Sequence, residues 1–167
     1  LHVRSRRQRQ MCIRDRIEPS EKSLYQAAWT LVGAGAYDVG NTIKPMSEVM
    51  PSYVKWIKEH AEEFMPDSNS VKTNSNTYTY DYLVVCPGLK LNFDGVAGLK
   101  ESLGKNNVCT NYSAEMATYT WECLKNLDGG TLLFTEPPMP IKCAGAPQKI
   151  AYLAADHLKK KGKLNDC

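Results

Sequence analysis

One cysteine stands where a thiol could do chemistry. Cys143 lies in the run IKCAGAPQKI, directly after Lys142 and four residues before Pro147, which suits the first turn of a helix. Lys149 would fall in the same turn. A nearby cation and the positive end of a helix dipole both favour the thiolate, which is the nucleophilic form of cysteine. A buried, inert cysteine is the alternative, because free cysteines are commonly buried. Both interpretations stay open from these residues alone.

The loop around this cysteine follows a predicted strand, Thr131–Thr135, and precedes a predicted helix. Dinucleotide-binding folds place their phosphate-binding glycines at such a strand-loop-helix position. This loop has no GxGxxG, and it carries prolines at 137, 138 and 140 and a cysteine where a glycine would let the backbone approach a pyrophosphate. The residues therefore argue against nucleotide binding at this loop.

The first 16 residues, LHVRSRRQRQMCIRDR, differ from the rest. They contribute +5 to a net charge of +3, so the remainder carries −2. Such a tail can be a transit peptide or a basic arm that binds nucleic acid. The preferred interpretation is a translated sequencing adapter, since RRQRQMCIRD back-translates to CGT CGG CAG CGT CAG ATG TGT ATA AGA GAC. We exclude residues 1–16 from functional reasoning, expect no nucleic-acid partner, and expect the biological sequence to be entered in mid-chain at Ile17.

The cysteines outside this tail form no recognisable metal site. Cys86, Cys109, Cys123, Cys143 and Cys167 are scattered, and no two have CxxC spacing. No zinc site is expected, and an odd, scattered set indicates a reducing compartment. No apolar run approaches the roughly 18 residues of a membrane-spanning helix.

Strands and helices are predicted to alternate, which is α/β organisation. Ile17 and Glu18 end one strand, and Val71–Thr73 and Tyr78–Val85 form a hairpin. Over Pro51–Phe64 the spacing of apolar residues favours a helix, although strands fit as well.

Two longer helices are predicted towards the C-terminus. Ser113 is a plausible cap for the first, and Pro147 begins the second. Their inward faces are read from helical spacing as Ala117, Trp121, Leu124 and Leu127 in the first helix, and Ile150, Leu153, Ala154 and Leu158 in the second.

Three stretches together resemble one known family. IKCAGAPQKI, with IEPSEKSLYQAAWTLVGAGA and YDYLVVCPGLKLNF, resembles the mitochondrial-type sulfide:quinone oxidoreductases, FAD-dependent flavoproteins with two dinucleotide-binding domains. The resemblance covers Ile17–Gly162. It implies a tandem Rossmann-like fold that is incomplete at both ends, with a partial FAD-binding domain over 17–110 and the start of a second domain over 111–167. It also implies extended strands, not a helix, around Val54–Ala61 and Glu63–Thr73.

The family implies roles for individual residues. Glu18 matches the acid that binds the adenosine ribose, Gln26 a flavin-contacting position, and Ala61 a backbone site at the adenine edge. Gly88 packs against the cofactor, and Cys143 matches one of two redox cysteines. The sequence departs from the family pattern at two positions, with Ala27 in place of proline and Cys86 in place of an alanine-like residue.

The implied reaction oxidises hydrogen sulfide. Hydrosulfide attacks a sulfur bridge between Cys143 and its partner, two electrons pass through FAD to ubiquinone, and the sulfane sulfur leaves to glutathione or sulfite. The family works at the matrix side of the mitochondrial inner membrane. We expect the pyrophosphate loop to lie upstream of Ile17, and the second cysteine and a C-terminal membrane anchor to lie downstream of Cys167. The fragment alone is then expected to be inactive.

Two other functions stay open from the sequence. A type II NADH:quinone dehydrogenase shares the fold and the quinone, but it should carry a glycine fingerprint at Cys143. A non-enzymatic, degenerate thiol-bearing module would require the full-length gene to lack the second cysteine.

Overall fold

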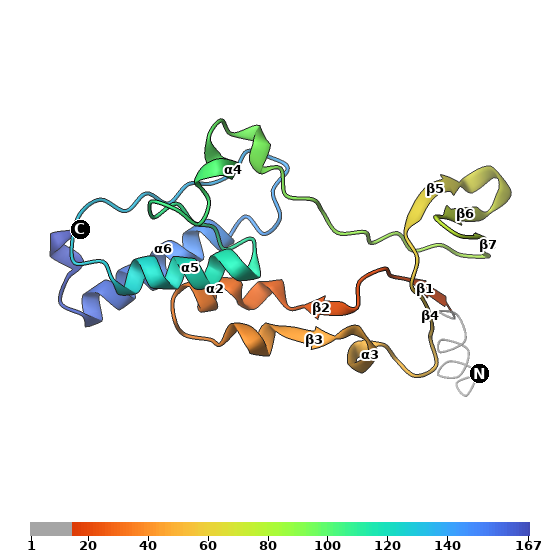
Figure 1. Cartoon of the computed structure of the whole chain (residues 1–167), viewed down its shortest axis with the longest axis horizontal. Coiled ribbons are helices and arrows are strands. Elements are labelled where there is room, and N and C mark those ends of the chain that lie inside the picture. The colour runs from red at the N-terminus through yellow and green to blue at the C-terminus, as the bar shows by residue number, and fades with distance from the viewer. Residues whose placement is uncertain (1–14) are drawn as a thin grey trace, which may run out of the picture. The chain divides into compact units, whose positions relative to one another are not determined.

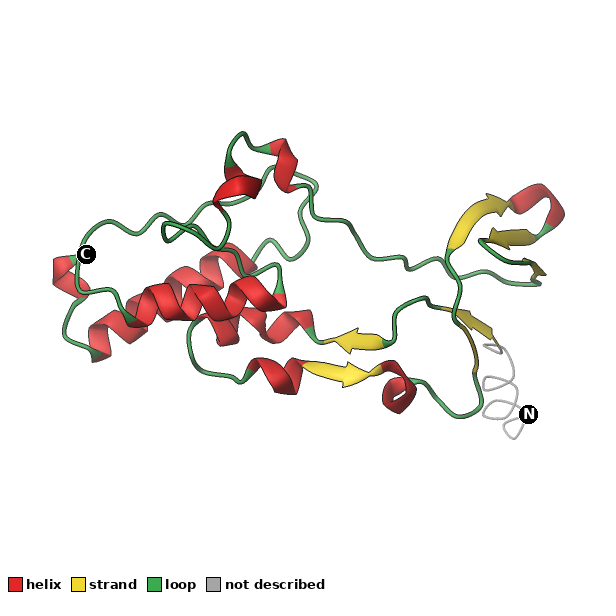
Figure 2. Ribbon diagram, in the orientation of Figure 1, coloured by secondary structure: helices red, strands yellow, loops and turns green. Residues whose placement is uncertain are grey.

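The computed structural model describes residues 15–167, which are built from short strands, short helices and two longer helices (Figures 1 and 2). Two compact units are present. Unit 1 comprises the described residues up to Ser23 together with Lys44–Pro87, and unit 2 comprises Leu24–Ile43 and Gly88–Cys167. The predicted domain division after residue 110 stays a prediction.

The strands of the described residues are short. They are β1 (Asp15–Ile17), β2 (Lys22–Leu24), β3 (Ile43–Pro45), β4 (Lys55–Ile57), β5 (Ala61–Met65), β6 (Ser70–Thr73) and β7 (Thr77–Thr79). They form three sheets, in the orders β1-β4, β2-β3 and β5-β6-β7.

The helices are mostly short as well. The α-helices are α2 (Trp29–Gly33), α3 (Met46–Val49), α4 (Leu99–Ser102), α5 (Ala114–Lys125) and α6 (Ala146–Lys160). The 3-10 turns are η1 (Gln26–Ala28), η2 (Val39–Thr42), η3 (Pro66–Ser68), η4 (Phe93–Gly95) and η5 (Leu164–Asp166). Within residues 15–167, no helix has both the length and the apolar composition needed to cross a bilayer.

In unit 1, β1 pairs in parallel with β4, and Ile17 lies opposite the buried Ile57. The strand ending near Glu18 is therefore confirmed. Most of the predicted adapter tail falls outside the described residues, but its last two positions, Asp15 and Arg16, lie in β1.

The sheet β5-β6-β7 is antiparallel. η3 connects β5 to β6, and Asn69 takes the left-handed conformation at φ 46° just before β6. The strands expected from the family around 54–73 are confirmed, and the helix that periodicity favoured over Pro51–Phe64 is wrong. Pairing with β1 and β6 satisfies the backbone of these residues and overrides the spacing of their side chains.

Two strand predictions are wrong. The hairpin strand ends at Thr79, and residues 80–85 lie in no strand, with Tyr82 and Val84 at 92% and 80% exposure. Residues 131–135 also lie in no strand, and Leu133 is 84% exposed. Apolar composition makes a segment suitable for a sheet, but a strand exists only where another strand accepts its backbone hydrogen bonds.

Unit 2 is organised by α2, α5 and α6. One core cluster joins Trp29 and Val32 of α2 to Ala117 of α5, and a second joins Leu124 of α5 to Ala154 and Leu158 of α6. Ile150 is buried as well, so the predicted faces of both long helices are confirmed except at Leu153, which is half-buried and belongs to neither cluster. Ser113 takes the cap position of α5 with extended backbone, although its side chain makes no capping hydrogen bond.

Candidate functional site

The loop that contains Cys143 leads directly into α6. The cysteine is exposed, and its backbone takes the left-handed conformation at φ 55°. Its carbonyl accepts a hydrogen bond from the Ala146 N–H at 2.9 Å, so the loop turns directly into the helix. The predicted helix start is confirmed with a shift of one residue, because Ala146 precedes Pro147 in α6. The alternative of a buried cysteine is wrong for this position.

A second hydrogen bond reaches the same carbonyl from outside the loop. The Tyr112 hydroxyl donates to the Cys143 carbonyl at 3.4 Å, across 31 residues of sequence. Burial raises the pKa of Tyr112, and the negative charges of Cys143 and Glu136 add to this shift. Tyr112 is therefore a titratable neighbour of the cysteine, and Glu136 is a neighbour of Tyr112.

Lys142 is the cation of this group. Its Nζ lies 5.7 Å from the ring centroid of Trp29, and the side chain is half-buried. Burial lowers the pKa of Lys142, and the electrostatic interaction with Cys143 offsets part of that shift. Lys149, in the first turn of α6, is exposed.

The Trp29 ring that Lys142 contacts is itself fixed. It is 3% exposed, and its Nε1–H donates to the Thr42 Oγ1 at 3.2 Å. The Thr42 hydroxyl in turn donates to the Val39 carbonyl at 2.6 Å. Neither Trp29 nor Tyr112 was singled out as a site residue from the sequence, and no local motif marks either of them as a neighbour of Cys143.

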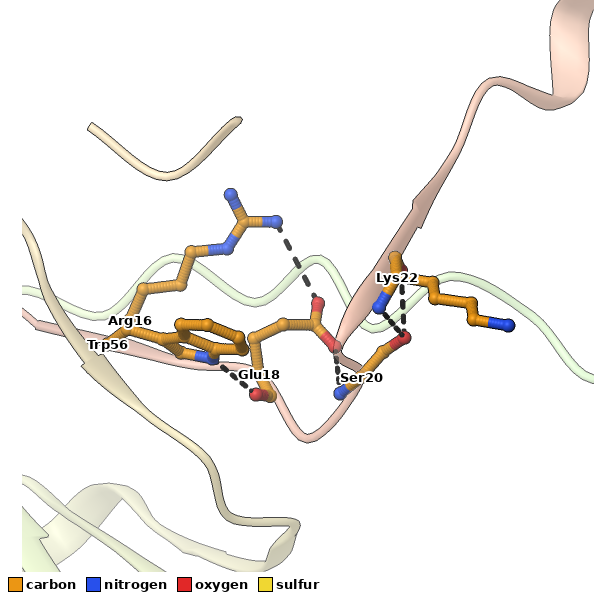
Figure 3. A network of polar contacts seen from close by, with 5 residues as sticks. All are labelled: Arg16, Glu18, Ser20, Lys22 and Trp56. Carbon is orange, nitrogen blue, oxygen red and sulfur yellow. Dashed lines mark hydrogen bonds and ion pairs between the residues drawn. The ribbon is translucent and has the colours of Figure 1, made fainter. Parts of the chain in front are cut away.

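Glu18 follows the carboxyl end of β1, and its surroundings are drawn in Figure 3. Its N–H donates to the Ile57 carbonyl at 2.9 Å, and its own carbonyl accepts from the Trp56 Nε1–H at 2.7 Å. Its carboxylate accepts from the Ser20 N–H at 2.9 Å and lies 3.8 Å from the Arg16 guanidinium. The side chain is 25% exposed, so part of the carboxylate faces solvent at the end of a parallel strand.

Ala61 begins β5 and pairs with Thr73 of β6. The preceding residue, His60, exchanges two hydrogen bonds with Asn74, from its N–H to the Asn74 Oδ1 at 2.8 Å and from the Asn74 N–H to its carbonyl at 3.1 Å.

Beside this pair, the Glu59 carboxylate accepts hydrogen bonds from three side chains. The Thr73 hydroxyl donates at 2.5 Å, the Asn76 amide at 2.8 Å and the Tyr78 hydroxyl at 3.0 Å. These bonds, led by the one from Thr73, lower the pKa of Glu59. The cluster ties the segment before Ala61 to the hairpin β6-β7.

Gln26 and Gly88, the remaining predicted cofactor-binding residues, are both exposed. Gln26 begins η1. Gly88 has φ 76°, and a Cβ at this position would meet no atom within 4 Å. Glu18 and Ala61 belong to unit 1, whereas Gln26, Gly88 and Cys143 belong to unit 2. Within residues 15–167, no group of three or more histidine, cysteine or acidic side chains could hold a metal ion.

Comparison with curated proteins finds similar sequences in three eukaryotes. The chain is 40% identical to the mitochondrial sulfide:quinone oxidoreductase of Mus musculus over 148 residues, which are 88% of this chain and 33% of the mouse protein. It is 45% identical to the protein of the same name from Dictyostelium discoideum over 148 residues, covering 87% of this chain and 33% of that protein. The Schizosaccharomyces pombe protein of that name is 33% identical over 148 residues. No family model matches the chain.

A solved structure has the same fold. The sulfide:quinone oxidoreductase from Aquifex aeolicus superposes with a TM-score of 0.65 at 24% identity, over 91% of this chain and 35% of that one. The resemblance predicted from the sequence and the α/β fold class are thereby confirmed. The chain spans about a third of the length of the curated relatives it matches.

Proposed function

We propose, on the premise that this chain belongs to the sulfide:quinone oxidoreductase family, that the whole protein oxidises hydrogen sulfide and passes two electrons to ubiquinone. The observation that carries the proposal is the identity of 40% and 45% to the two relatives over 148 residues. The whole chain of such a protein is about three times as long as the matched segment. We assign residues 17–110 to its FAD-binding domain and residues 111–167 to the start of its second domain.

Several residues fit the FAD that the family implies. Glu18 offers a partly exposed carboxylate at the end of a parallel strand, where such folds bind a ribose. Gly88 combines positive φ with open space beside its Cα, so a planar group could approach the backbone there. Gln26 is an exposed amide, and the backbone of Ala61 would meet the adenine. When bound, the flavin supplies two-electron transfer between thiol chemistry and a quinone.

Cys143 would carry the sulfur chemistry. Its thiol is exposed and its carbonyl is held by two donors, so a small anion can reach the sulfur while the loop stays in place. Hydrosulfide attacks a disulfide between Cys143 and a second cysteine. The disulfide bond breaks, a persulfide forms on Cys143, and the second cysteine leaves as a thiolate.

The sulfane sulfur then passes from Cys143 to a small nucleophile, glutathione or sulfite, which restores the Cys143 thiolate. The disulfide would re-form as the two cysteine thiolates lose two electrons, which the flavin would carry to the quinone. Three of the relatives are named as mitochondrial, and we propose a mitochondrial location for this protein as well. The matrix side of the inner membrane, with attachment through a C-terminal region, is the finer part of that proposal.

The test is sulfide-dependent reduction of a water-soluble ubiquinone analogue by the full-length protein. We expect Cys143→Ser to lower kcat by about a thousandfold, because a serine cannot form the disulfide or the persulfide. Cys167→Ser is the matched control, since it removes another exposed thiol and is expected to retain the wild-type rate. Equal rates for wild type and Cys143→Ser would refute the assignment of Cys143.

A further inference from the structure

Lys142 and Lys149 lie on either side of Cys143 in the sequence, and the structure gives them different surroundings. Lys142 is half-buried with its Nζ 5.7 Å from the Trp29 ring centroid, whereas Lys149 is exposed on the first turn of α6. An exposed lysine samples many rotamers and stays hydrated. A lysine held against an aromatic face keeps its charge in one place, and the ring stabilises that charge. Of these two lysines, Lys142 is therefore the one whose charge has a fixed position, and it is the residue directly before the cysteine.

The Trp29 ring that Lys142 contacts is held rigidly. Trp29 belongs to the core cluster with Val32 and Ala117, and its Nε1–H is bound by the Thr42 hydroxyl at 3.2 Å. Thr42 is 1% exposed. Because both the ring and its hydrogen-bond acceptor are buried, the ring cannot turn away from Lys142 without breaking the core.

The backbone of Cys143, the residue after Lys142, is held in place as well. Its carbonyl accepts hydrogen bonds from the Ala146 N–H and the Tyr112 hydroxyl, so the backbone of the cysteine is held both by α6 and by a residue distant in sequence. The titratable groups that interact with Cys143 are Lys142 and Tyr112, and Glu136 interacts with Tyr112. Lys142 is the one among these three that is positively charged at neutral pH.

We propose that Lys142, held on Trp29, is a positioning residue that concentrates anionic sulfur nucleophiles at Cys143, and that Lys149 does not share this role. The inference rests on the proposed function, for which hydrosulfide and sulfite are the relevant anions. A cation fixed at a partly desolvated site raises the local concentration of a small anion, and salt weakens that effect. Lys142 thus sets a preference for charged over neutral nucleophiles.

The first experiment is steady-state kinetics of the full-length enzyme at ionic strengths from about 0.01 M to about 0.5 M. Lys142→Met is expected to raise the KM for hydrosulfide about tenfold with a smaller change in kcat, and to flatten the dependence of KM on salt. Lys142→Arg keeps the charge and can stack on Trp29, so it should restore KM to within about threefold of wild type. Lys149→Met removes an exposed positive charge and so tests whether any nearby cation has the same effect as the fixed one. An equal rise in KM in Lys142→Met and Lys149→Met would overturn the proposal.

The second experiment does not depend on sulfide turnover. The reduced full-length protein is alkylated with negatively charged iodoacetate or neutral iodoacetamide, and the peptide that contains Cys143 is quantified by mass spectrometry. The ratio of the two rates cancels the fraction of Cys143 that is ionised. Lys142→Met is expected to lower the iodoacetate-to-iodoacetamide ratio about fivefold. An unchanged ratio would overturn the role of Lys142 even in an active enzyme. A lowered ratio without sulfide turnover would refute the proposed function and would still show that Lys142 favours anions at Cys143.

Discussion

Replacing Gly35 by alanine is expected to loosen the packing of α2 against α5. Gly35 follows α2 and has φ 70°, and its N–H donates to the Val32 carbonyl at 2.9 Å. A Cβ at this position would lie 2.5 Å from two ring carbons of Trp121 in α5. A glycine is needed here both for the backbone conformation and for the approach of the indole.

The loss of stability in Gly35→Ala follows from the strained backbone conformation and from the clash with the Trp121 ring. The left-handed conformation costs an alanine about 1–2 kcal/mol, and the reduced freedom of the unfolded chain offsets about 0.4–1 kcal/mol. Moving the Trp121 ring aside adds about 1–3 kcal/mol, since the ring packs against the cluster of Leu124, Ala154 and Leu158. The midpoints of these ranges add up to a net loss of stability of about 2.8 kcal/mol, within limits of about 1 and 4.6 kcal/mol, and this central value would speed amide hydrogen exchange in α5 roughly 100-fold.

The assay is hydrogen exchange with mass spectrometry on the full-length protein. Gly162→Ala is the matched control, because Gly162 has φ 71° and a Cβ there would meet nothing within 4 Å. It should cost about 1 kcal/mol or less and affect only the end of α6. Equal losses in the two variants would refute the contact with Trp121. A Gly35→Ala, Trp121→Leu double variant should lose less than the sum of the single variants, and strict additivity would refute the reasoning as well.

Two further predictions concern the ends of other elements. The Lys161 ammonium donates to two carbonyls at the end of α5, at 2.9 and 3.0 Å. Lys161→Met should therefore destabilise the last turn of α5 by about 1–2 kcal/mol, measured by hydrogen exchange, whereas Lys159→Met, at an exposed position of α6, should not. Equal exchange rates in the two variants would contradict this prediction. Hydrogen bonds lower the pKa of Glu59 from 4.5, so its contribution to the hairpin β6-β7 is present above pH 4.5 and is lost as the pH falls through the lowered value. Backbone exchange in β6 followed against pH should show this loss in wild type and not in Glu59→Gln, and identical pH profiles would contradict it.

The elements that could be predicted are those whose signals are local. The spacing of apolar residues and the position of Pro147 are contained within one stretch of chain, and α5 and α6 formed where they indicated. Strands depend on distant partners. Segments 80–85 and 131–135 have strand composition but lie in no strand. Pro51–Phe64 has helical spacing, yet it contains β4, which pairs with β1.

The candidate site divides in the same way. The sequence alone determined the cysteine, its flanking lysines, the helix after it and the family, because these lie in short continuous stretches. Only the tertiary structure decided that Lys142 and not Lys149 is held, since its partner Trp29 is far away in the chain and is fixed by Thr42. It likewise brought Tyr112 to the Cys143 carbonyl across 31 residues. Which side chains become neighbours over such separations is set by packing of the whole unit, and no local pattern of residues encodes it.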